Sequence, residues 1–312
     1  MVQTIQNDFL TVQINEMGAE LWSIQDNLGT EYLWEGDKRF WGRRSPILFP
    51  IVGSLKEKQY QYHKTTYQMN QHGFARDMKF TLVKQEALEC WYQLCSNEDT
   101  KEKYPFEFEL EIGYRLVEKK IQVMWKVKNL GTEQMYFSIG AHPAFCCPIY
   151  KKDSSIEMKE RGKERKEYFL KLDGIKKLEL SMIDPKSGLL LSQTKPLFLS
   201  DDEIDPKSGF LAIEDSLFEN DALIAEQNQT QKVSLCTPDK KEYLSVSFDA
   251  PLFGIWSPKQ KEEGIAPFIC IEPWYGRCDR ADFTGELSQR EWGNQLEAKS
   301  EFKAEYEIEI YN

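Results

Sequence analysis

The sequence predicts an all-β protein built from antiparallel strands. Apolar and polar residues alternate strictly over residues 106–116, where aromatic and aliphatic side chains occupy every second position and glutamates lie between them. The same two-residue period recurs at 121–127, 244–248 and 302–310. A period of two places one side of each segment on a core and the other in water. Long helical stripes with caps are missing, so the pattern indicates a sandwich or a barrel.

The domain organisation follows from length and linker composition. A chain of 312 residues is long enough for two domains, but all-β domains of this size often form one unit. No linker rich in Gly, Ser or Pro interrupts it, so we predict a single domain over residues 1–312. Residues 151–167 are dense in Lys and Glu and predict a solvated excursion. The hexapeptide IDPKSG occurs at both 183–188 and 204–209 and predicts two similar turns.

Charge and targeting signals exclude several classes of partner. The formal charge of −11 disfavours binding to nucleic acid or to an anionic membrane, because their phosphates would be repelled. Neither a signal peptide nor a membrane-spanning segment is expected. Seven cysteines without a CxxC pair favour a reduced, cytoplasmic protein.

Most motif-based chemistries can be set aside. There is no HExxH or CxxC, and the adjacent Cys146 and Cys147 would point to opposite faces of a strand, so we predict no metal site. On a strand, His142 and Cys146 would lie ~13 Å apart, too far for a thiolate pair. Nucleotide-binding glycine loops and a GxSxG elbow are also missing. Acid–base chemistry remains.

Three short motifs carry titratable residues suited to that chemistry. His72 lies in HGFARD (72–77), His142 in GAHPAF (140–145), and Glu272 in IEPWYGR (271–277). Histidine titrates near neutral pH, and a glutamate in an aromatic turn can have its pKa tuned. Glycines beside both histidines are expected to let the backbone approach a ligand closely. The third histidine, His63, lacks such a setting and is interpreted as an ordinary surface or core residue.

Five blocks together resemble the aldose 1-epimerase (galactose mutarotase-like) family, most closely its LacX-like branch. They are the three motifs above, WGRRSPILFP (41–50) and LFENDALI (217–224), and they occur in the family's order. The resemblance covers nearly the whole chain. It implies a large antiparallel β-sandwich, the galactose mutarotase-like supersandwich, with a sugar-binding cleft on one concave face.

The resemblance also implies a role for each motif residue. Glu272 matches the general base that takes the anomeric proton, and His142 the general acid that protonates the ring oxygen. His72 matches the second histidine, which hydrogen-bonds the ring oxygen or a neighbouring hydroxyl. The expected sugar-binding residues are Arg44 (exchangeable with Arg43), Arg76, Asp221, Phe74 and Trp274. The expected partner is a small hexose, and the implied isomerase needs no cofactor.

Three alternatives stay open at this point. Arg43, Arg76, Arg277 and Arg280 lie in or beside the motifs, and any two could fork a phosphate, which would suit a hexose 6-phosphate. The chain could instead bind sugar without turnover. Glycoside cleavage would require a second carboxylate opposite Glu272, for which Asp221 is the candidate. The sequence does not indicate an oligomeric state.

Overall fold

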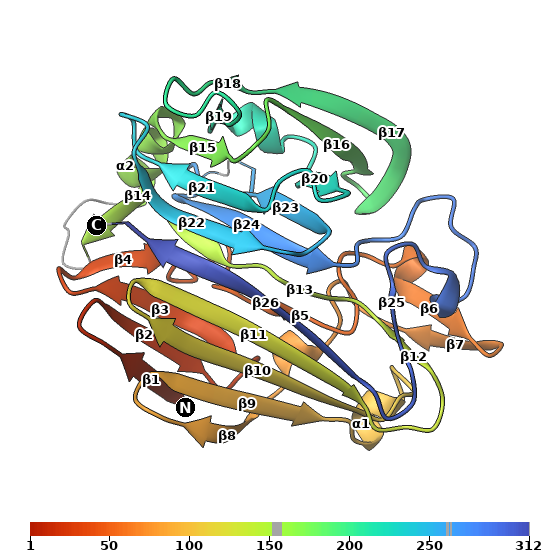
Figure 1. The fold of residues 1–312 in the computed structure, drawn as a ribbon. Helices are drawn as coiled ribbons and strands as arrows, with labels where there is room; N and C mark the ends of the chain where they lie inside the picture. The colour runs from red at the N-terminus through yellow and green to blue at the C-terminus, as the bar shows by residue number, and fades with distance from the viewer. Residues whose placement is uncertain (152–157, 260–261, 263, 312) are drawn as a thin grey trace.

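The computed structural model describes residues 1–151, 158–259, 262 and 264–311, and strands dominate it (Figure 1). Two large antiparallel sheets are stacked face to face, as the sequence predicted. In the described ranges the longest helix has seven residues, far short of the length that spans a bilayer.

Twelve strands of the described chain form the first sheet, which carries the candidate site. Its main order is β1-β2-β3-β4-β14-β24-β23-β20-β16-β17, and β13 joins it by pairing with β24 and with β5. The bounds are β1 Val2–Gln6, β2 Leu10–Asn15, β3 Glu20–Asp26, β4 Thr30–Leu33, β5 Ile47–Leu48, β13 Ile139–Ala141, β14 Ala144–Lys151, β16 Lys177–Asp184, β17 Leu189–Phe198, β20 Leu223–Glu226, β23 Leu252–Trp256 and β24 Phe268–Tyr275.

The second sheet has ten strands within the same ranges, in the order β18-β19-β15-β21-β22-β26-β11-β10-β9-β8. Its bounds are β8 Thr81–Gln85, β9 Glu89–Cys95, β10 Phe108–Val117, β11 Lys120–Asn129, β15 Phe169–Leu172, β18 Ser200–Asp201, β19 Gly209–Ala212, β21 Lys232–Cys236, β22 Glu242–Phe248 and β26 Glu301–Ile310. The predicted alternation lies in its centre: Leu110 on β10 is opposite Val127 on β11, and both are fully buried. The intervening glutamates of β10 face outward and pair with lysines of β11.

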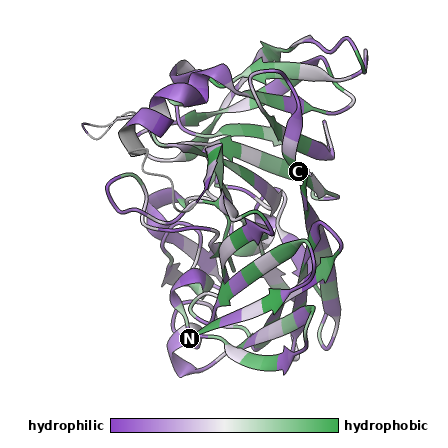
Figure 2. Ribbon diagram, turned by 90° about the vertical axis from the view of Figure 1, so that its left-hand side faces the viewer, coloured by the Kyte–Doolittle hydropathy of each residue, from purple (hydrophilic) through white to green (hydrophobic). Residues whose placement is uncertain are grey.

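Short elements surround these sheets. Two two-stranded ribbons pair β6 (Gln59–Tyr62) with β7 (Thr65–Gln68) and β12 (Met135–Phe137) with β25 (Asn294–Leu296). The helices are α1 Glu98–Lys101, α2 Met158–Glu164, η1 Lys56–Lys58, η2 Ala75–Asp77, η3 Arg165–Glu167, η4 Asp215–Phe218 and η5 Leu287–Gln289. In Figure 2 hydrophobic residues gather on the strands, whereas loops and helix α2 are mostly hydrophilic. The core between the sheets is therefore built by alternate strand residues.

The charged segment 151–167 is only partly what the sequence predicted. Residues 152–157 lie outside the described residues, and 158–167 form α2 and η3. Arg165 is buried rather than solvated, because its guanidinium donates to the Ala266 carbonyl at 2.9 Å and forms an ion pair with Asp215. For this residue the prediction of a solvated excursion was wrong: a buried ion pair and hydrogen bonds compensate its desolvation.

Both IDPKSG repeats form the predicted turns. In each turn the aspartate side chain accepts hydrogen bonds from the serine hydroxyl and from the lysine N–H, at Asp184 in the first copy and Asp205 in the second. The first turn joins β16 to β17 and ends at Gly188, which reaches the cavity described below.

Candidate active site

The central strand β24 positions the glutamate. Phe268, Cys270, Glu272 and Trp274 occupy alternate positions and therefore share one face, whereas Ile269 and Ile271 enter the main core. On this face Glu272 lies between two apolar clusters. One contains Cys270 with Trp34 and Phe268, and the other contains Trp274 with Leu48 and Leu252. The carboxyl group is therefore 1 % exposed and largely removed from water.

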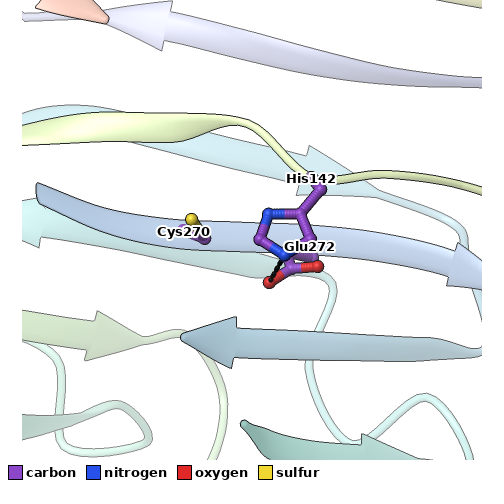
Figure 3. A group of neighbouring side chains, drawn as sticks. All are labelled: His142, Cys270 and Glu272. Atoms are coloured by element: carbon purple, nitrogen blue, oxygen red, sulfur yellow. Dashed lines mark ion pairs between the residues drawn. The ribbon is translucent and has the colours of Figure 1, made fainter. Parts of the chain in front are cut away.

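His142 meets this glutamate from the loop between β13 and β14. Its Nε2 lies 3.3 Å from Oε1 of Glu272 (Figure 3). The indole of Trp41 stacks on the imidazole at 4.8 Å between ring centroids, and Trp256 meets it edge-on at 5.4 Å. These rings fix the plane of the imidazole and shield it from solvent.

His72 completes the group. Its ring stands edge-on to that of His142, with centroids 5.7 Å apart. Its backbone has φ of 65°, in the left-handed region that a residue with a side chain seldom adopts, and such strain is often found at functional sites. The N–H of Gly53 donates to Nδ1 of His72 at 3.1 Å. Neutral imidazole carries one proton, so this bond places it on Nε2.

Burial sets the protonation of all three groups. Desolvation, with a smaller contribution from Asp221, raises the pKa of Glu272 well above its usual value. Desolvation also lowers the pKa of His142 to about 3 and that of His72 well below its usual value; the positive charges of Arg76 and Arg43 add to both shifts. Each group alone is thus favoured in its neutral form.

Several buried polar atoms of these residues have no hydrogen-bond partner within the described chain. Both carboxylate oxygens of Glu272 and Nδ1 of His142 are buried and accept no hydrogen bond there. Buried polar atoms are normally paired, so these atoms are available to a ligand. Cys270 lies two residues before Glu272 on the same face (Figure 3). Its Sγ, an imidazole nitrogen of His142 and a carboxylate oxygen of Glu272 lie within 4.8 Å of one another, a donor group that would suit a metal ion.

A cavity of ≈ 290 Å³ lies in front of these side chains. Three of the predicted sugar-binding residues line it, namely Arg76, Asp221 and Trp274. Sequence reasoning had not assigned Trp41, Trp256 or Gln71, which also line it. Trp41 is the first residue of the block 41–50 and Gln71 directly precedes His72, so their places in the sequence could have indicated that both lie near the site. Trp256 lies outside every motif, and nothing in the sequence indicated it. A larger groove of ≈ 770 Å³ around Trp91 and Lys126 contains no histidine, so its chemistry is less suited to acid–base work.

The other predicted binding residues lie outside this lining. Arg44 donates to the Trp22 carbonyl at 2.6 Å, and its guanidinium stacks over the Trp22 ring. Phe74 packs in the main core, edge-on to Phe49. Arg43 pairs with Asp77 at 2.8 Å, and the Arg76 Nε is 3.9 Å from the same carboxylate. Arg76 also donates to the Gln71 carbonyl at 2.7 Å.

The two motif glycines make room for neighbouring protein atoms. A Cβ on Gly140 would lie 2.7 Å from the Trp274 ring, and one on Gly73 would clash with the Phe49 carbonyl oxygen. Both glycines therefore allow close approach of protein to protein; close approach of their backbone to a ligand stays a prediction. Gly140 makes room for the indole that forms one wall of the cavity.

Comparison with known proteins identifies the family. A sequence model of the family described as aldose 1-epimerase matches residues 1–291. The chain belongs to the aldose 1-epimerase family. It is 32% identical to the chromosomal LacX protein of Lactococcus lactis subsp. lactis over 319 residues, which cover 100% of both chains.

Solved structures of this family share the architecture. The galactose mutarotase related enzyme from Lactobacillus acidophilus is 32% identical with a TM-score of 0.85, covering 100% of this chain and 98% of that one. A galactose mutarotase-like protein from Lactobacillus casei ATCC 334 is 28% identical with a TM-score of 0.84, and the match covers 100% of both chains. Membership of the aldose 1-epimerase family supports an isomerase that acts on sugars. The architecture of these solved structures agrees with the fold that the sequence predicted.

Proposed function

We propose that the protein interconverts the α and β anomers of a hexose by acid–base ring opening and reclosure. The observation that carries this proposal is the buried contact between His142 Nε2 and Glu272 Oε1 at 3.3 Å, at a carboxyl group whose oxygens have no hydrogen-bond partner in the described chain. One group that releases a proton and one that accepts it, in a cavity the size of a small ligand, are what anomerisation requires.

The protonation state of the pair must change when the sugar binds. In the free site burial favours a neutral carboxylic acid beside a neutral imidazole. Moving the proton from Glu272 to His142 creates an ion pair at 3.3 Å, whose attraction is about 5 kcal/mol at an effective dielectric constant of about 20. That attraction offsets part of the desolvation penalty, so the ionised pair is accessible as the reactive form.

The reaction then follows from the positions of these groups. Ionised Glu272 takes the proton of the anomeric hydroxyl while His142 gives its proton to the ring oxygen. The bond between C1 and the ring oxygen breaks, leaving an open-chain aldehyde. After rotation about C1–C2 the ring hydroxyl attacks the other face of the carbonyl. The two proton transfers reverse, and the opposite anomer leaves with both catalysts restored.

His72 contributes as a neutral hydrogen-bond donor. Because the Gly53 N–H occupies its Nδ1, the Nε2–H is the free donor, and we assign it to the ring oxygen or a neighbouring hydroxyl. Its lowered pKa, caused by burial and then by the nearby His142, keeps this tautomer uncharged at neutral pH.

The remaining cavity residues suit a single sugar ring. The volume of ≈ 290 Å³ lies at the lower end of the range for ligand pockets. We assign Arg76 and Asp221 to sugar hydroxyls, and the indoles of Trp41 and Trp274 to the apolar face of the ring.

A neutral hexose is favoured over a hexose 6-phosphate. Three of the four arginines that might have forked a phosphate have carboxylate partners outside the cavity lining: Arg277 is buried beside Glu226, Arg280 pairs with Asp282, and Arg43 pairs with Asp77. Arg76 alone lines the cavity, with Arg43 nearby but bound to Asp77. One guanidinium can orient a sugar hydroxyl, but it balances only part of the charge of about −1.5 to −2 that a phosphate group carries.

The test is exchange spectroscopy of the anomers at equilibrium, with glucose, galactose and their 6-phosphates. Wild type should accelerate exchange of at least one sugar, and Glu272→Gln and His142→Asn should each lose about 10²-fold or more of that acceleration. Glu203→Gln, at an exposed site, is the control for a change of charge. Sugar binding without acceleration would replace the proposal by a non-catalytic sugar-binding role.

A further inference from the structure

Cys270 is a buried thiol beside the proton-transfer pair, and the proposed reaction does not use it. It is fully buried and lies on the same face of β24 as Glu272. His142 extends from the loop before β14 to Glu272, and Cys270 lies to one side of this pair on the same strand (Figure 3). Nothing near it in the sequence reveals this thiol as a partner, since the cysteines beside His142 in the chain are Cys146 and Cys147.

The three donor groups form the set that a zinc-type cation prefers. Imidazole nitrogen, thiolate sulfur and carboxylate oxygen are its usual ligands, and sites with three protein ligands keep a fourth position open. Two ligands at about 2.0–2.1 Å from a tetrahedral ion are about 3.3–3.4 Å apart. The nitrogen and oxygen of His142 and Glu272 already have this separation, at 3.3 Å. One donor atom from each of the three residues lies within 4.8 Å of the other two, so small shifts of the side chains would bring all three to coordination distance.

A second observation points to a ligand at this position. Glu272 is 1 % exposed and His142 8 % exposed, yet within the described chain neither carboxylate oxygen accepts a hydrogen bond. Both residues also line the cavity, so the fourth position of a bound ion would face the space where the sugar is placed. Unpaired buried oxygens that face a cavity are available for coordination.

We propose that His142, Cys270 and Glu272 form a binding site for a divalent transition-metal ion of the zinc class, and that the bound ion inhibits the isomerase. Uptake of the ion releases the thiol proton of Cys270 and the carboxyl proton of Glu272 to solvent, while His142 binds as neutral imidazole. Two anionic ligands then balance the two charges of the ion, and no electron is transferred. The ion occupies the lone pairs that the proton relay needs, so binding and anomerisation are mutually exclusive.

Metal binding is tested first without any sugar, which separates it from the proposed function. The complete protein carrying Cys95→Ser, which removes the exposed thiol, is titrated with Co²⁺. We expect one equivalent to bind, with thiolate-to-cobalt charge-transfer absorption and competition by Zn²⁺. Cys270→Ala should abolish this absorption and weaken binding at least tenfold, because loss of a supporting residue alone typically costs 10–100-fold. Cys236→Ala, a buried thiol on β21 in the opposite sheet, should change neither.

The outcomes decide the proposal. Absence of stoichiometric Co²⁺ uptake, or unchanged thiolate absorption in Cys270→Ala, would overturn the site. If Cys270→Ala does not fold, as judged by circular dichroism, Glu272→Gln gives the same test, since it should also weaken Co²⁺ binding at least tenfold.

Inhibition rests on the proposed function and is measured separately. Zn²⁺ should slow catalysed anomer exchange, and Cys270→Ala should need at least tenfold more Zn²⁺ for the same effect. Equal Zn²⁺ sensitivity of the two proteins would refute inhibition through this site. An inactive wild type that still binds Co²⁺ through Cys270 would instead contradict the proposed function and leave the metal site established.

Discussion

The buried residues His72, His142 and Glu272 should make the stability of this protein depend on pH in a residue-specific way. His72 and His142 have lowered pKa values in the folded protein because burial disfavours their charged form. As pH falls below about 6.5 the unfolded chain gains a proton at each histidine and the folded protein does not, so the free energy of unfolding decreases. Glu272 acts with the opposite sign. Its raised pKa keeps it protonated when folded, so its stabilising contribution is present at low pH and is lost as pH rises.

The size of each contribution follows from these shifts. Between about pH 7 and 5 His142, whose folded pKa is about 3, removes about 2 kcal/mol of stability. His72 acts in the same direction, and neutral Glu272 opposes both histidines. For His142, with a folded pKa of about 3, the full loss on further acidification is about 5 kcal/mol. The decrease in the free energy of unfolding between pH 7 and 5 should therefore be largest in Glu272→Gln, because both histidines then act without the opposing effect of Glu272. It should be intermediate in wild type and smallest in His142→Asn, where His72 alone opposes Glu272.

Urea unfolding followed by tryptophan fluorescence at the two pH values measures these differences. Carboxylates elsewhere in the protein titrate alike in all variants, so they cancel in the comparison. His63→Asn, in the exposed turn between β6 and β7, controls for loss of a histidine. If His142→Asn retained the wild-type pH dependence, His142 would not be held neutral by burial, and the protonation argument for the site would be wrong.

Three further predictions concern the walls and the support of the cavity. Gly140→Ala would place a methyl group 2.7 Å from the Trp274 ring, so it should destabilise by about 1–3 kcal/mol in urea unfolding and raise KM. Asp279→Ala removes the carboxylate that pairs with Arg290 (2.6 Å) and accepts the Lys56 N–H (3.1 Å). The segment 53–56, whose Gly53 N–H donates to His72, should then be held less firmly. We expect a loss of about 3–5 kcal/mol of stability and altered nitrogen shifts of the His72 ring by NMR. Arg76→Gln should weaken hexose and hexose 6-phosphate alike, by about 10–100-fold in kcat/KM; a selective loss of the phosphorylated sugar would favour the phosphate alternative.

Much of the fold could be predicted because local alternation reports which face of a strand is buried. Residues 108–117 and 120–129 became β10 and β11 with their apolar positions in register. The order of strands in the first sheet could not be predicted, because β4, β14 and β24 pair across long stretches of chain and each is buried on both faces. Nearly continuous apolar runs lack the period that would mark a face.

The candidate site was predictable only where a motif carried it. His72, His142 and Glu272 come together as the resemblance implied, and Trp274 lies beside them. Arg44 and Phe74 belong to the same blocks but point elsewhere, because a motif fixes the course of the backbone and tertiary packing decides where each side chain goes. Cys270 and Trp256 had no local signal. Cys270 lies near His142 because β14 pairs with β24, where Ala144 is opposite Cys270, and the pairing of β23 with β24 then places Trp256 beside them.

The surroundings of the glutamate favour the reactive role that we propose for these side chains over a purely stabilising one. A buried ion pair serving stability would have its remaining lone pairs occupied by hydrogen bonds, as in the pair of Arg290 with Asp279, where the carboxylate also accepts the Lys56 N–H. Glu272 has no such partners in the described chain and is flanked by apolar clusters on both sides. Its unsatisfied oxygens therefore weaken the unliganded protein, and a ligand that supplies a hydroxyl proton or a cation recovers that free energy on binding. The same unpaired oxygens thus serve both the proton transfer and the metal binding that we propose.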